Sequence, residues 1–496
     1  MSLIAGHSQP TINDWYSLGR PQTEMLSIKV TDSCYYSSLI AIDNDTNLIW
    51  DQFFLTIDFN GNVTNQKFLH SDTSHINGYG SELINSTDGS FATICDFGDY
   101  FLFCKYDPID DTICQVLIDS LFDHHNLSSG GQGKIIQREA DSTYYFISQV
   151  QNMTDMSIHL AVIHLNNNGL LQNFEVFPLD TGFYNFRAED IIDQGDGICF
   201  SSFILKVGGT NVDDRRHVRL IKLDYNLNLI WTWTDWNNLL DSYPSGITTT
   251  SDGGLIYGGK SGEYLSQSNS FNYKARITKL KNDFTIDWEL ELEESFNPDF
   301  IGFNDIIQIS DSRFVATGNK LTDSMTVGWL IEFDIDGNLK WESEFNFAPV
   351  SLNSNPKHLL LDVEKTPDNG YILSGTAHNT EMTNQGVFGR FGWIVKTDSV
   401  GCLVPGCQDF LSQDEPENFE IEMYPNPATD YMYVKTSQHI EGNIQIFDMT
   451  GKLVLGWKSQ PYNMSYIIDV STLDPGNYIL KTDNDMVRGE QFVVVR

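Results

Sequence analysis

Four acidic residues recur at one position of a repeated pattern, and their chemistry depends on whether they meet. Each lies six residues before an aspartate that is centred in a turn: Glu82, Asp190, Asp305 and Asp362. The other three copies of the pattern carry Leu26, Ile135 and Gly246. Grouped carboxylates can bind a hard cation such as Ca²⁺ through oxygen, or act as a catalytic acid–base pair. They can also accept backbone N–H hydrogen bonds from a neighbouring element, and recurrence at a repeat position favours this structural role.

The pattern that contains these residues is a pair of hairpins that occurs seven times. The first hairpin is an apolar strand, an aspartate-centred turn and a second apolar strand, with turns at Asp32, Asp88, Asp141, Asp196, Asp252, Asp311 and Asp368. The second hairpin is centred on Asp58, Asp107, Asn166, Asp224, Lys281, Asp334 and Asp398. Seven units of four strands predict an all-β fold, a seven-bladed β-propeller over residues 9–398. The innermost strands would then place the carboxylates around one mouth of the central channel.

The seventh unit indicates how the ring closes. It has only three predicted strands, at 359–365, 370–376 and 390–398, whereas an orphan strand at 14–18 precedes the first unit. We therefore predict that this N-terminal strand completes blade seven. The residues Trp231, Trp288 and Trp341 each follow a second-hairpin turn by seven positions, which predicts packing between neighbouring blades.

Composition restricts the partners and the compartment. The chain has 30 basic and 67 acidic residues, a net charge of −37, which argues against nucleic acid as a partner. No apolar run approaches the roughly 18 residues of a membrane span, so we expect no membrane insertion. Cys402 and Cys407 lie in the short segment GCLVPGC, and we predict a disulfide hook within a linker over 399–422. Residues 1–8 have the character of the end of a signal peptide.

Residues 423–496 differ from the repeats and predict a small immunoglobulin-like antiparallel β-sandwich. They contain the blocks YPNPA, IFDMTGK and LDPGNY in order, followed by a late glycine. The segment resembles the type A C-terminal sorting domain of the type IX secretion system of Bacteroidetes. The residues that carry the resemblance are Pro425, Asn426, Pro427, Gly451, Lys452, Gly476, Tyr478 and Gly489.

The resemblance implies an export route and partners. Such a chain would pass through the periplasm, engage the outer-membrane translocon and shuttle of the type IX system, and reach the cell surface or the medium. For the propeller we expect a binding or adhesion module for an unknown extracellular ligand, glycan or protein. The alternative is a secreted hydrolase or lyase that acts on polysaccharide or protein through the channel-mouth carboxylates. No nucleophile, zinc or phosphate-loop motif is present, which favours binding; Ca²⁺ is the one cofactor that the carboxylates suggest, and no metal site is firm.

Overall fold

The computed structural model divides the chain into two compact units, residues 1–405 and 406–496. All regular elements in its described part are β-strands. The described residues are 10–18, 20, 22–42, 50–69, 76–77, 82–97, 99–118, 127–155, 157–177, 183–206, 215–236, 240–265, 270–297, 299, 301–322, 325–346, 357–379, 389–403, 421–436, 443–449, 451–458, 465–482 and 490–495. The predicted signal-peptide remnant at 1–8, Cys407 and Gly489 lie outside these residues.

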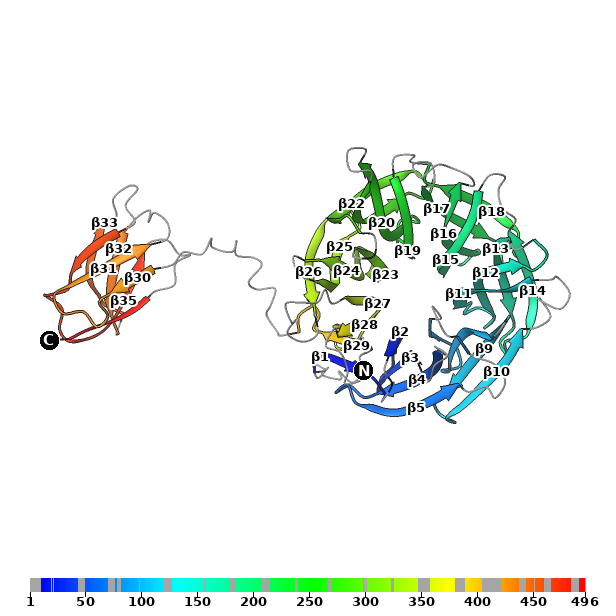
Figure 1. Cartoon of the computed structure of the whole chain (residues 1–496), viewed down its shortest axis with the longest axis horizontal. Coiled ribbons are helices and arrows are strands. Elements are labelled where there is room, and N and C mark those ends of the chain that lie inside the picture. The colour runs from blue at the N-terminus through cyan, green and yellow to red at the C-terminus, as the bar shows by residue number, and fades with distance from the viewer. Residues whose placement is uncertain are drawn as a thin grey trace. The chain divides into compact units, whose positions relative to one another are not determined.

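The first unit is a seven-bladed β-propeller around a central channel (Figure 1), as the repeats predict. Each blade is an antiparallel sheet whose first strand is innermost. Blades one to three comprise β2 (Gln22–Val30), β3 (Tyr35–Ile42), β4 (Trp50–Ile57) and β5 (Val63–Leu69); β6 (Ile76–Asn77), β7 (Ile84–Asn85), β8 (Phe91–Phe97), β9 (Tyr100–Asp107) and β10 (Thr112–Ile118); and β11 (Leu127–Gln137), β12 (Tyr144–Asn152), β13 (Ile158–Leu165) and β14 (Leu171–Phe177). In blade two, β6 and β7 both pair with β8.

Blades four to six repeat the same four-stranded plan. They comprise β15 (Phe183–Asp193), β16 (Ile198–Lys206), β17 (Arg216–Leu223) and β18 (Leu229–Thr234); β19 (Leu240–Thr249), β20 (Leu255–Leu265), β21 (Ser270–Leu280) and β22 (Ile286–Ser295); and β23 (Gly302–Ser310), β24 (Arg313–Leu321), β25 (Thr326–Asp334) and β26 (Leu339–Phe345). The two middle strands of each blade are the most buried, as in β25, where eight of nine residues are buried. The cores therefore lie between blades, because both faces of these strands are covered.

Blade seven combines the two ends of the propeller. It comprises β27 (His358–Lys365), β28 (Tyr371–Asn379), β29 (Gly389–Thr397) and the N-terminal strand β1 (Ile12–Tyr16). β1 pairs antiparallel with β29, with Asn13 opposite Val395, two residues earlier in the chain than the predicted 14–18. The Tyr16 hydroxyl donates to the Gly61 carbonyl of blade one at 2.7 Å, so the same strand also contacts the next blade.

Aspartate side chains close several of the second-hairpin turns. Asp58 Oδ1 accepts the backbone N–H groups of Asn60 and Asn62, which closes a tight turn. Asp224 in blade four and Asp334 in blade six accept the equivalent pair of bonds.

The predicted interblade packing of the three tryptophans is confirmed. The Trp231 ring lies 4.0 Å from that of Phe284, centroid to centroid, across the boundary of blades four and five. Trp288 Nε1 donates to the Ile335 carbonyl of blade six at 2.9 Å. The Trp341 ring lies 5.9 Å from that of Tyr371 in blade seven.

The second unit is a small sandwich of two antiparallel sheets, also as predicted. One sheet contains β30 (Ile421–Tyr424), β31 (Tyr431–Thr436) and β34 (Ser465–Asp469); the other contains β32 (Asn443–Asp448), β33 (Leu453–Lys458), β35 (Gly476–Thr482) and β36 (Glu490–Val494). Its core contains Met432, Ile446, Ile468, Leu480 and Phe492, all at most 4% exposed. Within the described part of the chain, no helix has the length and apolar character needed to cross a membrane.

The motif residues of this unit occupy turns and strand contacts. Asn426 Oδ1 accepts the Val493 N–H at 2.9 Å, so the Pro-Asn-Pro turn fastens the last strand. Gly451 has a φ of +83°, a conformation that glycine adopts without strain, and the neighbouring Lys452 N–H donates to Asp448 Oδ1. The Tyr478 hydroxyl donates to the Asp474 carbonyl at 2.7 Å and closes the third motif block.

Candidate functional site

Irregularities in the inner strands shape the mouth of the channel. The pairing register of the inner strand shifts between Met25 and Ser27, between Phe303 and Asp305, and between Leu360 and Asp362. Related shifts occur in β19 and on both sides of Ala188 in β15. A β-bulge leaves one residue unpaired and re-aims its side chain. The extra residues line the channel mouth: Leu26, Arg187, Glu189, Ser245, Asn304 and Leu361.

The residue that follows the bulge accepts a backbone hydrogen bond from the next blade. Asp362 Oδ2 accepts the Ile28 N–H at 2.7 Å, and Asp190 Oδ2 accepts the Ile247 N–H at 2.7 Å. Asp305 Oδ2 accepts the Val363 N–H at 3.1 Å. Three of the four predicted carboxyl groups thus accept hydrogen bonds from the next blade.

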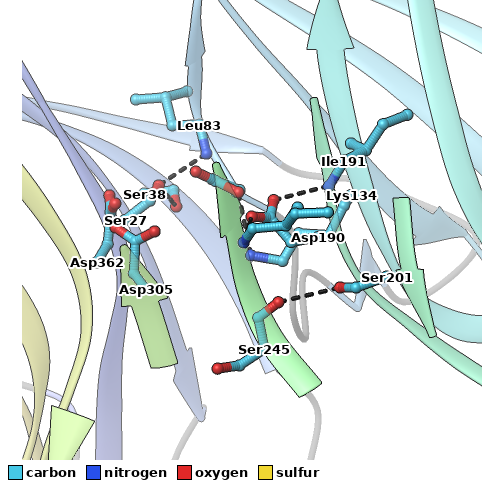
Figure 2. Close-up of polar contacts among 12 residues, drawn as sticks. Ser27, Ser38, Leu83, Lys134, Asp190, Ile191, Ser201, Ser245, Asp305 and Asp362 are labelled. Carbon is cyan, nitrogen blue, oxygen red and sulfur yellow. Dashed lines mark hydrogen bonds and ion pairs between the residues drawn. The ribbon is translucent and has the colours of Figure 1, made fainter. Parts of the chain in front are cut away.

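Blade one uses a different residue for this contact than the sequence repeat indicates. The repeat aligns Leu26 with the carboxylates, but Leu26 is the bulged residue and Ser27 occupies the pairing position. Ser27 Oγ accepts the Leu83 N–H of blade two at 2.7 Å (Figure 2). The one-residue offset arises in the turn, because blade one has four residues between the paired Val30 and Tyr35, whereas blade seven has five between Lys365 and Tyr371.

Glu82 is held by two lysines instead of a backbone group. Lys134 Nζ of blade three lies 3.0 Å from Glu82 Oε2, and Lys29 Nζ of blade one lies 3.6 Å from Oε1. Lys29 is 7% exposed and also lies 2.5 Å from Glu364 Oε1 and 3.5 Å from Asp362 Oδ2. We call Lys29, Lys134, Glu82, Asp362 and Glu364 the channel ion network.

Burial and neighbouring charges both shift the pKa values of the groups in this region. Burial alone would lower the pKa of Lys29, yet Asp362, Glu364 and Glu82 together raise it well above its usual value. Burial raises the pKa of Asp190 to about 7, in spite of the nearby Lys134. The pKa of Asp305 is raised well above its usual value by burial and by the neighbouring Asp362 and Glu82.

The lysines of the channel ion network would oppose binding of a calcium ion by the predicted carboxylates. Two ammonium groups already lie among the carboxylates, so a calcium ion placed there would meet cationic repulsion. Among the described residues, no group of three or more His, Cys, Asp or Glu side chains is arranged to hold a metal ion.

Two cavities of about 290 and 550 Å³, which share much of their lining, form what we call the mouth pocket; Glu82 and Lys134 of the channel ion network line the smaller one. Both cavities are lined by Arg187, Glu189, Asn304, Leu361, His378 and Arg390, among others. The larger cavity has four cationic side chains, Arg187, Lys260, Lys357 and Arg390, against two anionic ones, Glu189 and Asp299. Of the four predicted carboxylates, the residues lining the pocket include Glu82; Asp190, Asp305 and Asp362 make the interblade bonds described above.

The basic residues of the pocket were not predicted. Arg187, Lys260 and Lys357 each occur in a single copy of the repeat, and Arg390 shares its position only with Arg216, so recurrence does not reveal them. Their scarcity in the chain was the available signal, since only 30 of 496 residues are Lys or Arg.

A family match supports the export route. Residues 422–496 match the family described as the secretion system C-terminal sorting domain. The chain therefore carries the C-terminal sorting domain of the type IX secretion system and is a β-propeller protein secreted across the outer membrane to the surface or the medium. The sorting domain implies interaction with the type IX secretion machinery.

Solved structures resemble the chain at low identity. The structure of the Dos1 propeller is 12% identical and covers 73% of this chain and 75% of its own, with a TM-score of 0.40. Drosophila Semaphorin 2a is 8% identical, with coverages of 98% and 97% and a TM-score of 0.44. An α-L-arabinofuranosidase from Fusarium graminearum is 10% identical, with coverages of 64% and 93% and a TM-score of 0.41. No curated protein matches, and likenesses this distant carry no argument about function.

Proposed function

We propose that the propeller is an extracellular binding module that holds part of a glycan or protein in the mouth pocket. The observation that carries this proposal is the pocket itself, which is lined by inner-strand bulge residues and by Glu82 and Lys134 of the channel ion network. Volumes of about 290 and 550 Å³ match the range of sites for small ligands or ligand segments. Export to the surface gives such a site access to extracellular material.

The engagement of the carboxylates supports binding over catalysis. A general acid or base has to reach the substrate within hydrogen-bond distance. Asp305 and Asp362 instead point their carboxylates at backbone N–H groups of the next blade, and Glu82 is paired with lysines. These contacts join neighbouring blades and so stabilise the closed ring.

A hydrolase or lyase acting on polysaccharide or protein is the second candidate. It is favoured by Asp190, because a carboxyl group with a pKa of about 7 can exchange a proton at neutral pH. Asp190 lies beside Glu189, which lines the pocket, although Asp190 itself bonds the Ile247 N–H.

A ligand array with the full chain tests the binding proposal. Leu361→Trp adds bulk inside the pocket, and Leu170→Trp makes the same change at an exposed turn, where Leu170 is 52% exposed. We expect Leu361→Trp to abolish binding to a glycan or peptide that the parent chain and Leu170→Trp retain. Equal binding by the parent chain and both variants would show that the mouth pocket is not the binding site. Cleavage of an arrayed polysaccharide or peptide that is lost in Asp190→Asn would establish the enzyme instead.

We also propose that Cys402 and Cys407 form the predicted disulfide, which would fix the chain where it leaves the propeller. The first half of this segment is well anchored, since the buried Cys402 donates its N–H to Asp398 Oδ1 at 2.8 Å. A side chain at Gly401 would meet the Trp341 ring, so the turn lies directly against blade six. Non-reducing peptide mapping of the exported protein should recover the 402–407 pair; two alkylated thiols would exclude it.

A further inference from the structure

We propose that the mouth pocket recognises the acidic group, carboxylate or sulfate, of an acidic oligosaccharide, with Arg187 and Lys260 as its anion-binding residues. This inference rests on the proposed binding function and adds the ligand class. It follows from one strained residue, from the local charge and from the mixture of groups in the pocket.

Arg187 is held in the pocket by an unfavourable backbone conformation. Its φ is +33°, in a region that non-glycine residues rarely adopt, and the register of β15 shifts next to it. Such strained conformations persist only where the surrounding structure holds them, and they cluster at active and ligand-binding sites. The side chain is 48% exposed and contacts Glu189, with Nε 3.3 Å from Oε1. The bulge therefore presents a solvent-accessible guanidinium to the pocket, and nothing in the repeat requires it.

The larger cavity of the mouth pocket has a surplus of basic side chains in a strongly acidic protein, whereas the smaller cavity has equal numbers of basic and acidic ones. The chain carries more than two acidic residues for each basic one, but the larger cavity reverses that ratio. Burial lowers the pKa of Lys260; Asp299 and Glu189 oppose this shift, whereas Arg216 and Arg187 add to it. Burial, reinforced by Arg390 and Lys357, lowers the pKa of His378 to about 3. The His378 shift is in the direction that a positive local potential produces, and an anionic ligand would relieve that potential.

The remaining groups in the pocket suit a sugar. Glu189 and Asp299 can accept hydrogen bonds from hydroxyls, and Asn304 offers an amide. Leu359 and Leu361 supply a small apolar surface for the face of a sugar ring. This mixture of polar and apolar side chains, with cations for an acid group, favours an acidic saccharide over an extended apolar peptide.

Titration calorimetry with the full chain tests this assignment. The probes are oligosaccharides of uronic acids, sulfated oligosaccharides, the neutral oligosaccharide matched to each, and short peptides. The variants are Arg187→Gly, which suits the observed φ, and Lys260→Gln. Lys340→Gln is the matched control, because Lys340 is paired with Asp334 on the outer strand of blade six.

We expect an acidic oligosaccharide to bind, and each pocket variant to weaken that binding roughly tenfold or more, as loss of a charge-assisted bond predicts. The control should bind like the parent chain, and added salt should weaken binding. Equal affinity for the acidic probe and its neutral counterpart, or equal affinity in parent and pocket variants, would overturn the acidic specificity.

The same experiment separates this inference from the proposed function. A neutral oligosaccharide or a peptide whose binding is lost in Leu361→Trp would leave the binding module intact and remove only the acidic ligand. Absence of any binding sensitive to Leu361→Trp would overturn both.

Discussion

At the scale of single residues, Lys29 holds the centre of the propeller together. Its ammonium group faces Glu82, Asp362 and Glu364, which come from two different blades. A buried ion pair is weak evidence for net stabilisation, but removing one partner leaves uncompensated charge in a poorly solvated place. Loss of Lys29 should therefore lower the stability of the propeller by more than the intact ion pairs add to it.

The corresponding prediction is that Lys29→Met strongly destabilises the propeller. The three carboxylates would be left without their shared cation, at a cost of roughly 3–5 kcal/mol. Urea denaturation of the full chain measures the loss, and Lys340→Met is the control, since an exposed pair contributes at most about 1 kcal/mol. The deficit should shrink at low pH, where the carboxylates become neutral. Equal losses in both variants would show that the network is not a stabilising element.

A second residue-scale prediction concerns pH. The pKa of Asp190 is about 7 in the folded chain, above the value of about 4 for an unperturbed aspartate. The folded state therefore binds this proton more tightly, so its contribution to stability is present below about pH 4 and is lost as the pH rises to about 7.

Asp190→Asn should reduce this loss of stability with rising pH. Urea denaturation at about pH 5 and about pH 8 measures the slope, which should be shallower in the variant than in the parent. Part of the slope should remain, because burial also raises the pKa values of Asp362 and Glu364. Asp336→Asn, at an exposed turn, should leave the slope unchanged. An unchanged slope in Asp190→Asn would contradict the shifted pKa.

At the scale of elements, a short turn of the sorting domain controls the last strand. Asn426 Oδ1 accepts the Val493 N–H, and Ala428 and the last strand exchange further backbone bonds, Ala428 N to Val493 O and Val495 N to Ala428 O. The motif residue is thus a structural acceptor that fixes the end of the chain in one register.

Asn426→Ala should loosen β36 specifically. Loss of this acceptor is expected to cost about 1 kcal/mol and to speed hydrogen exchange at residues 490–494 in the full chain. Asn426→Asp keeps an oxygen acceptor and should restore slow exchange. If both variants exchange alike, the amide oxygen has no role in holding the strand.

At the scale of the whole molecule, the architecture of the propeller could be predicted from the sequence and the composition of its mouth could not. Turn aspartates such as Asp252 and Asp368 mark each hairpin, because a turn needs particular residue types. The bulges that turn Arg187 and Leu361 toward the channel leave the apolar pattern unchanged. The position of Lys29 between two blades depends on ring closure, which joins residues more than 300 positions apart.

Closure of the ring gives the last prediction, because β1 connects three blades. Asn13 Oδ1 accepts the Trp393 Nε1–H at 2.7 Å in blade seven, and Asn13 Nδ2 donates to the Asn346 carbonyl after blade six. The Tyr16 hydroxyl donates to the Gly61 carbonyl of blade one.

Deleting the residues before Gly19 would remove these contacts and expose the edge of β29, which would then be open to pairing with another chain. We expect a lower thermal midpoint and concentration-dependent association, measured by melting and light scattering. Asp14→Asn, an exposed change that keeps the strand, should melt like the parent. A truncated chain that melts like the parent and remains monomeric would show that β1 is dispensable for closure.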